Sequence, residues 1–171
     1  KEVERAGSRE DGAKELVQLA LDFLHKGDLA MAMKRYNQAW LVNPNNADIY
    51  FGFARIAEKK NNPDEAIDMY TKAINLNPDY ALAYSNRGLN YFHKGDKSGD
   101  LGDIEKALAD FNKAIELEPS DAQNYNDRAA CYAIKKDYDK SWNDVHKAQE
   151  LGYKVNSFFL NKLQKVSGRE R

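Results

Sequence analysis

The chain has few of the residues that mark disulfide-rich, membrane-spanning or nucleic-acid-binding proteins. One cysteine occurs in 171 residues, so no disulfide can form within the chain. No apolar run approaches the roughly 20 residues that a membrane helix needs, so membrane insertion is not expected. Lys and Arg number 26 and Asp and Glu 27, a net charge of -1. This balance argues against a nucleic-acid partner.

Catalytic and cofactor motifs are also missing. The three histidines, His25, His93 and His146, are far apart, and none has a serine or cysteine beside it in a known motif. The phosphate-binding, dinucleotide-binding and zinc-protease patterns do not occur. Cys131 lies on an apolar helical face, where cysteine behaves as a small hydrophobe. We therefore expect no enzyme activity, no catalytic residues, no cofactor and no metal.

Proline is scarce, but its distribution is regular. Only four prolines occur, and three of them follow an alanine by five positions. The corresponding alanines, together with a fourth, are spaced 34, 41 and 34 residues apart: Ala39, Ala73, Ala114 and Ala148. A bulky apolar residue precedes each alanine by three positions. A period of 34 indicates a repeat architecture.

Each repeat is predicted to form two antiparallel helices. In the first repeat, Leu16, Leu19, Ala20, Phe23 and Leu24 have the spacing of a buried helical stripe. A Gly-Asp turn then separates helix A from helix B, and an Asn-Pro pair ends helix B, because the residue before proline disfavours helical geometry.

These signals divide the chain into successive segments. We expect a flexible tail over 1–12, four repeats over 13–155, a capping helix over 156–167 and a tail over 168–171. The repeats are predicted at 13–46, 47–80, 81–121 and 122–155. The third is longer by a seven-residue insertion in the Gly- and Asp-rich stretch Gly95–Asp103, which we expect to be a loop.

The repeat resembles the tetratricopeptide repeat (TPR). The second repeat carries the matching residues most regularly, and the others follow it with changes: Tyr50, Phe53, Ala54, Ala57, Ala66, Tyr70, Ala73 and Pro78. The resemblance implies an all-α fold, a right-handed superhelix (α-solenoid) of antiparallel helix pairs. It also implies that the A helices line a concave groove that binds a peptide or protein segment, and that the chain is a scaffold or adaptor.

Candidate binding residues are those on the A helices that point away from the B helices. Asparagine amides can form paired hydrogen bonds with the backbone of an extended peptide, and cations can pair with its carboxylates. The predicted peptide-binding residues are Arg55, Lys59, Asn86, Asn90, His93, Asn126 and Asp127.

Two more specific interpretations do not fit the residues. TPR domains that clamp the acidic tail of large chaperones resemble one another in a Lys, Asn, Asn, Lys, Arg set, and only Asn86 matches it here. The carboxylates between Asp96 and Glu105 suggest calcium, but the Gly and Glu that an EF-hand loop requires are replaced by Leu101 and Ala107.

The sequence thus predicts a non-enzymatic interaction scaffold with a protein or peptide ligand. Two alternatives stand beside it: a self-associating module that forms a homodimer, and an accessory domain of a larger enzyme or membrane-associated complex. The chain begins without an initiator Met. We expect a soluble protein, and the sequence leaves its compartment open between the cytoplasm and, if a leader was removed, the bacterial periplasm.

Overall fold

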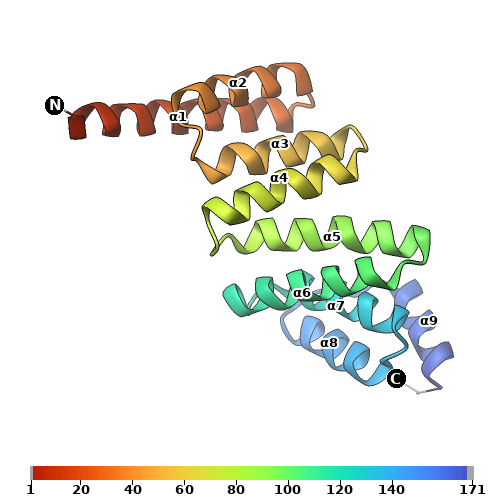
Figure 1. Ribbon diagram of the computed structural model, residues 1–171. Coiled ribbons are helices and arrows are strands. Elements are labelled where there is room, and N and C mark those ends of the chain that lie inside the picture. Colours follow the sequence, from red (N-terminus) through yellow and green to blue (C-terminus); the bar gives the residue numbers. More distant parts are fainter. Residues whose placement is uncertain (1, 169–171) are drawn as a thin grey trace. The chain divides into compact units, whose positions relative to one another are not determined.

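The computed structural model describes residues 2–168, and their side chains from residue 9 onward. Within this range the chain forms nine α-helices and no strand (Figure 1). The helices are α1 (Glu2–His25), α2 (Leu29–Val42), α3 (Ala47–Lys59), α4 (Pro63–Leu76), α5 (Ala81–Ser98), α6 (Leu101–Leu117), α7 (Ala122–Ile134), α8 (Tyr138–Glu150) and α9 (Ser157–Ser167). Two compact units divide them, an N-terminal unit (Lys1–Ala83) and a C-terminal unit (Tyr84–Arg171).

Helix ends in the N-terminal unit follow the predicted capping chemistry. The Asp28 carboxylate accepts a hydrogen bond from the backbone N–H of Met31 at 3.0 Å and so caps α2. Asn62 caps α4, whose first residue is Pro63. Proline suits this position because its missing N–H would have no partner there in any case.

Aromatic rings fill the core of the N-terminal unit. The Tyr36 side chain is fully buried, and Phe53 packs edge-on against it, with ring centroids 5.9 Å apart. Between the first two repeats, the Trp40 indole N–H donates a hydrogen bond to the Tyr50 hydroxyl at 3.0 Å. These contacts join α2 to α3 through large side chains, which bury much apolar surface.

Two clusters form the core of the C-terminal unit. One joins α6 to α7 through Ile104, Phe111 and Cys131, all of them fully buried. The other joins α7, α8 and α9 and includes Val145 and Leu163. Cys131 is fully buried, as predicted for a small apolar residue, and this burial raises the pKa of its thiol to about 12.

Small residues stand where helices A and B of a repeat cross. Each of the following has an exposed fraction of zero: Ala20, Ala32, Ala54, Ala66, Ala107, Ala129 and Ser141. The Ser141 hydroxyl donates to the Ala129 carbonyl at 2.8 Å, which satisfies its buried polar group. Gly88 has the same role, since an added Cβ would lie 3.1 Å from the Asp110 Cβ.

The first segment differs from the sequence-based expectation. The sequence predicts a flexible tail over 1–12, but α1 begins at Glu2. The segment is rich in residues of good helix propensity, and Lys14 pairs with Glu10 one turn earlier at 2.8 Å. The absence of an apolar stripe therefore does not exclude a helix in this segment.

The insertion in the third repeat also differs from expectation. The sequence predicts a loop over Gly95–Asp103, but α5 continues to Ser98 and α6 begins at Leu101. Only the turn at Gly99 and Asp100 is non-helical. Asp100 caps α6 by accepting from the Gly102 N–H at 2.8 Å. An added Cβ on Gly95 would lie 2.9 Å from the Asp100 carbonyl oxygen, so glycine lets the two lengthened helices approach.

The C-terminal end is closed by α9. Asn156 caps this helix, and the Trp142 indole N–H of α8 donates to the Ser167 hydroxyl at 3.1 Å. Of the predicted tail 168–171, Gly168 ends the helix with a left-handed conformation, and residues 169–171 lie outside the described range. No helix in the described part of the chain has the length and apolarity needed to cross a bilayer.

Candidate functional site

The seven predicted binding residues lie on the A-type helices of the two units. Arg55 and Lys59 are on α3 in the N-terminal unit. The other five are in the C-terminal unit, on α5 and α7: Asn86, Asn90, His93, Asn126 and Asp127.

In the N-terminal unit, Arg55 is near buried tyrosines. Its guanidinium Nε lies 3.2 Å from a Glu58 carboxylate oxygen, and 38% of its side chain is exposed. Burial raises the pKa of Tyr36 to about 12, and this effect outweighs the positive charge of Arg55, which lowers that pKa. The Tyr36 hydroxyl is buried without a hydrogen-bond partner among the described residues. Lys59 is exposed near the end of the same helix.

Three further α3 residues have the spacing of the predicted groove face. The Tyr80 hydroxyl donates to the Asp48 carboxylate at 2.9 Å. Phe51 is buried instead of open, because the Tyr80 ring stacks on it with centroids 5.1 Å apart. Gly52 is likewise buried, and any side chain there would meet the Tyr36 ring. Sequence spacing did not predict the aromatic rings that cover this part of α3.

On α5, the side-chain amides of two asparagines differ in their hydrogen bonds. The Asn90 amide nitrogen donates to the Asn86 carbonyl oxygen at 2.8 Å, one turn earlier on the same helix. The Asn86 amide nitrogen is buried and has no hydrogen-bond partner within the described residues. An unpaired buried donor costs about 1–3 kcal/mol, so this amide gains if a rotation of the half-buried Asn86 side chain brings it to an acceptor.

On α7, Asn126 and Asp127 form a polar pair. The Asn126 amide donates to a carboxylate oxygen of Asp127 at 3.1 Å. Burial raises the pKa of the Asp127 carboxyl, while hydrogen bonds from Asn126 and Gln123 and the charge of His93 lower it. Because the charge of His93 on α5 lowers the pKa of Asp127 on α7, these two helices bring side chains close enough to interact electrostatically.

Sequence reasoning missed two buried ion pairs in the C-terminal unit. Arg87 on α5 contacts Asp110 on α6 through two hydrogen bonds, of 2.9 and 2.7 Å. Arg128 on α7 contacts Asp144 on α8 in the same way, at 2.8 and 2.7 Å. The repeat pattern could have revealed these ion pairs. Arg87 and Arg128 occupy the same position of helix A, and Asp110 and Asp144 occupy the same position of helix B.

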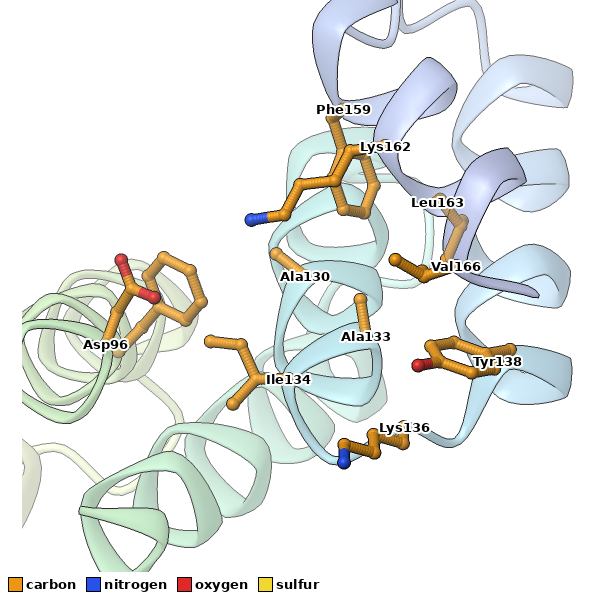
Figure 2. A pocket seen from close by; sticks show the side chains of 11 residues that line it. Asp96, Ala130, Ala133, Ile134, Lys136, Tyr138, Phe159, Lys162, Leu163 and Val166 are labelled. Atoms are coloured by element: carbon orange, nitrogen blue, oxygen red, sulfur yellow. The ribbon is translucent and has the colours of Figure 1, made fainter. Parts of the chain in front are cut away.

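Sequence reasoning also missed a cavity of about 270 Å³ in the C-terminal unit. Figure 2 shows it between α5, α7 and α9, with Ala130 and Ala133 on α7 and Phe159 and Leu163 on α9. Three charged residues also line it, and they are Asp96, Lys136 and Lys162. The cavity depends on how α9 packs, which the repeat pattern alone does not specify.

Oxygen, nitrogen and sulfur ligands do not gather into a metal site in the described residues. No group of three or more His, Cys, Asp or Glu side chains there has a geometry that could hold an ion. The carboxylates of the third-repeat insertion have other contacts, since Asp103 pairs with Lys106 at 2.8 Å and Asp100 caps α6.

Paired helices, small crossing residues and a 34-residue period define a repeat protein of the TPR class. Family models agree: a TPR repeat model matches residues 58–95, and two tetratricopeptide repeat models match 90–121 and 111–143. The chain belongs to the tetratricopeptide repeat family, and its fold is an all-α TPR solenoid.

Several solved structures share this fold. MamA has a TM-score of 0.70 and 24% identity, over 81% of this chain and 77% of that chain. A thermophilic TPR protein from Thermus thermophilus has a TM-score of 0.72 and 21% identity, over 92% and 84% of the two chains. The first TPR of Spaghetti (RPAP3), bound to the HSP90 peptide SRMEEVD, has a TM-score of 0.61 and 27% identity, over 72% and 91%.

Proposed function

We propose that this protein is a non-enzymatic interaction scaffold that binds a peptide or protein segment along the concave face of its A helices. The family supports the scaffold role, since TPR repeats form protein-interaction modules. The first TPR of Spaghetti, which is 27% identical to this chain, is bound to a peptide, and this supports peptide binding as the form of the interaction.

The single observation that carries the proposal is the unpaired amide nitrogen of Asn86. This donor is buried without a partner in the described part of the chain, on an A helix. An extended peptide has a carbonyl oxygen at every residue and so supplies the acceptor that this donor lacks. Asn126 and Asp127, on the next A helix, offer a further donor and acceptor.

Arg55 and Lys59 are the proposed binding residues of the N-terminal unit. Both are on α3, and Lys59 forms no ion pair within the described residues. Because exposed cations gain more from a carboxylate partner than from water alone at low salt, they favour a peptide with an acidic residue. The expected ligand is therefore an extended segment with some negative charge.

Panning a random dodecamer peptide library on the full chain tests this proposal. Bound peptides are expected, and their affinity should fall at least tenfold in Asn86→Ala and Asn126→Ala and to a smaller extent in Arg55→Ala. Asn37→Ala and Lys34→Ala, on the exposed side of α2, are matched controls that should bind normally. Recovery of no binding peptides, or equal affinity in all five variants, would contradict the proposal.

Self-association is a second candidate function, favoured by one side chain. Phe158 on α9 is 76% exposed, and a large exposed aromatic ring is a common component of protein interfaces. Sedimentation across protein concentration should show a dimer that Phe158→Glu dissociates. A monomer at all concentrations would exclude this function and leave peptide binding untouched.

A further inference from the structure

The cavity between α5, α7 and α9 has the chemistry of a side-chain pocket with a charged entrance. The small residues Ala130 and Ala133 line one side of it, and the ring of Phe159 lies on the α9 side (Figure 2). Phe92 of α5 also lines it. A volume of about 270 Å³ is large enough for one bulky apolar side chain and part of its backbone. Such a side chain would exchange water for an apolar environment, which is the main favourable contribution to binding of this kind.

The charges at the cavity favour an anionic ligand. Lys136 and Lys162 lie at opposite ends of it, and Asp96 lies on the α5 side (Figure 2). None of these three side chains has a hydrogen bond or ion pair among the described residues, whereas Lys135, Lys140 and Lys147 nearby are all paired. Two unpaired ammonium groups against one carboxylate leave a net positive charge beside an apolar space.

The backbone at Lys136 supplies an independent observation. This residue has φ of 61°, the left-handed conformation that residues other than Gly and Asn adopt at a cost. The same repeat position holds Gly27 in the first repeat and Asn61 in the second, both also with positive φ. Lysine is thus a poor choice for the turn, but it brings an ammonium group to the cavity. Strain of this kind concentrates at functional sites.

We propose that this cavity is a specificity pocket that takes one bulky apolar side chain of a bound peptide, with an Asp or Glu on either side of that residue paired to Lys136 or to Lys162. The proposal rests on the proposed peptide-binding function and names the part of the peptide that is selected. The cavity lies along α5 and α7, the helices that carry His93 and Asp127, so one extended segment can reach both.

Selection from a dodecamer peptide library on wild type and on a variant with a filled cavity tests whether the cavity binds a peptide side chain. Wild type should enrich dodecamers in which Phe, Leu, Met or Trp stands within two positions of Asp or Glu. Ala133→Leu, which fills the cavity, should abolish that enrichment. Ala109→Leu, on the exposed face of α6, is the matched control and should enrich the same peptides. Enrichment unchanged in Ala133→Leu would overturn the proposal.

Charge variants separate the pocket from the rest of the binding surface. With an enriched peptide, Lys162→Glu should weaken binding at least tenfold, and Lys165→Glu, one turn away and outside the cavity, should not. Lys136→Asn should weaken binding while raising the melting temperature, a combination that a purely structural role would not produce.

The remaining outcomes are also decisive. Peptide binding that depends on Asn86 and Asn126 but not on Ala133 or Lys162 would overturn the pocket and retain the proposed function. Absence of any peptide binding would overturn both. A concentration-dependent dimer that Ala133→Leu dissociates would assign the cavity to a second copy of the chain and would overturn the peptide proposal.

Discussion

The two units have residues of different polarity at one position of helix A and the position of helix B that corresponds to it. In the second repeat, helix A carries Phe53 and helix B carries Met69. In the third and fourth repeats these positions hold arginine and aspartate, joined by paired hydrogen bonds. The second repeat of the N-terminal unit therefore has two apolar residues at these positions, and the C-terminal unit has buried ion pairs.

The first repeat has only part of the ionic arrangement. It has Leu19 and Arg35 at the two positions, so an arginine is present without a facing acid. The Arg35 Nε is buried without a hydrogen-bond partner within the described residues, while its terminal nitrogen donates to Gln38 at 2.9 Å. The comparison shows that the same two repeat positions hold apolar residues in one repeat and a buried ion pair in another.

The largest expected effect comes from removing one member of an ion pair. Asp110→Ala should lower the free energy of unfolding by about 3–5 kcal/mol, because the buried Arg87 guanidinium loses the carboxylate with which it forms two hydrogen bonds. The pair is well shielded, with side-chain exposures of 17% for Arg87 and 6% for Asp110. Urea unfolding followed by circular dichroism measures the change.

The double variant Arg87→Phe/Asp110→Met is the control for that experiment. It places the residues of the second repeat in the third, and replacement of a whole buried pair by apolar groups is often neutral or stabilising. We expect stability within about 1 kcal/mol of wild type. A double variant as unstable as Asp110→Ala would show that the two units differ in volume at this position and not only in charge.

Much of the fold could be predicted from the sequence because its pattern recurs in four repeats. Alanines at the helix crossings and prolines after the B helices indicated the helix pairs, and an Asn or Asp cap precedes most helices. The loop prediction at Gly95–Asp103 failed because Gly and Asp, read locally, signal a turn. In the structure Gly95 is needed for a close helix approach, and Asp100 alone provides the cap.

The candidate site was less predictable than the fold. Helical spacing placed all seven residues on A helices, but it did not distinguish the unpaired Asn86 amide from that of Asn90, which bonds to its own helix. It also missed the cavity and the Arg–Asp pairs, since these depend on contacts between residues 16 or more positions apart. Periodicity within one helix contains no information on such contacts.

A second prediction contrasts glycines on the A helices of the two units. Gly52→Ala should cost about 2 kcal/mol, because the new methyl group would meet the buried Tyr36 ring and force it to move. Gly88→Ala adds a methyl group 3.1 Å from the Asp110 Cβ, and the gain in helix propensity of about 1 kcal/mol offsets the smaller displacement. Thermal unfolding of both variants should therefore show a large loss for the first and little change for the second. Equal losses would contradict the inference that an added methyl group meets a larger steric conflict at Gly52 than at Gly88.

A third prediction exchanges the turn residues at the left-handed position. Lys136→Asn should raise the free energy of unfolding by about 0.5–1 kcal/mol, because asparagine tolerates this conformation better than lysine. The reverse exchange in the N-terminal unit, Asn61→Lys, should lower it by a similar amount. Melting temperatures in parallel scans compare the two. A destabilised Lys136→Asn would mean that the Lys136 side chain contributes to folding.

The smallest effect is expected from Asp127→Asn, whose effect on the free energy of unfolding depends on pH. Asp127 occupies the repeat position of Asn86, and Asp127→Asn transfers that amide to the fourth repeat. Burial raises the pKa of the Asp127 carboxyl above its ordinary value of 3.8, so the native state holds its proton more tightly than the unfolded state does. As pH rises through this range, the wild type must ionise a half-buried carboxyl group and loses stability, whereas the asparagine variant has no proton to lose. Urea midpoints should therefore coincide below the ordinary carboxyl pKa, and the variant should be the more stable protein at pH 7. A difference of the same size at both pH values would show that the effect comes from the hydrogen bonds with Asn126 and Gln123 and not from the buried charge.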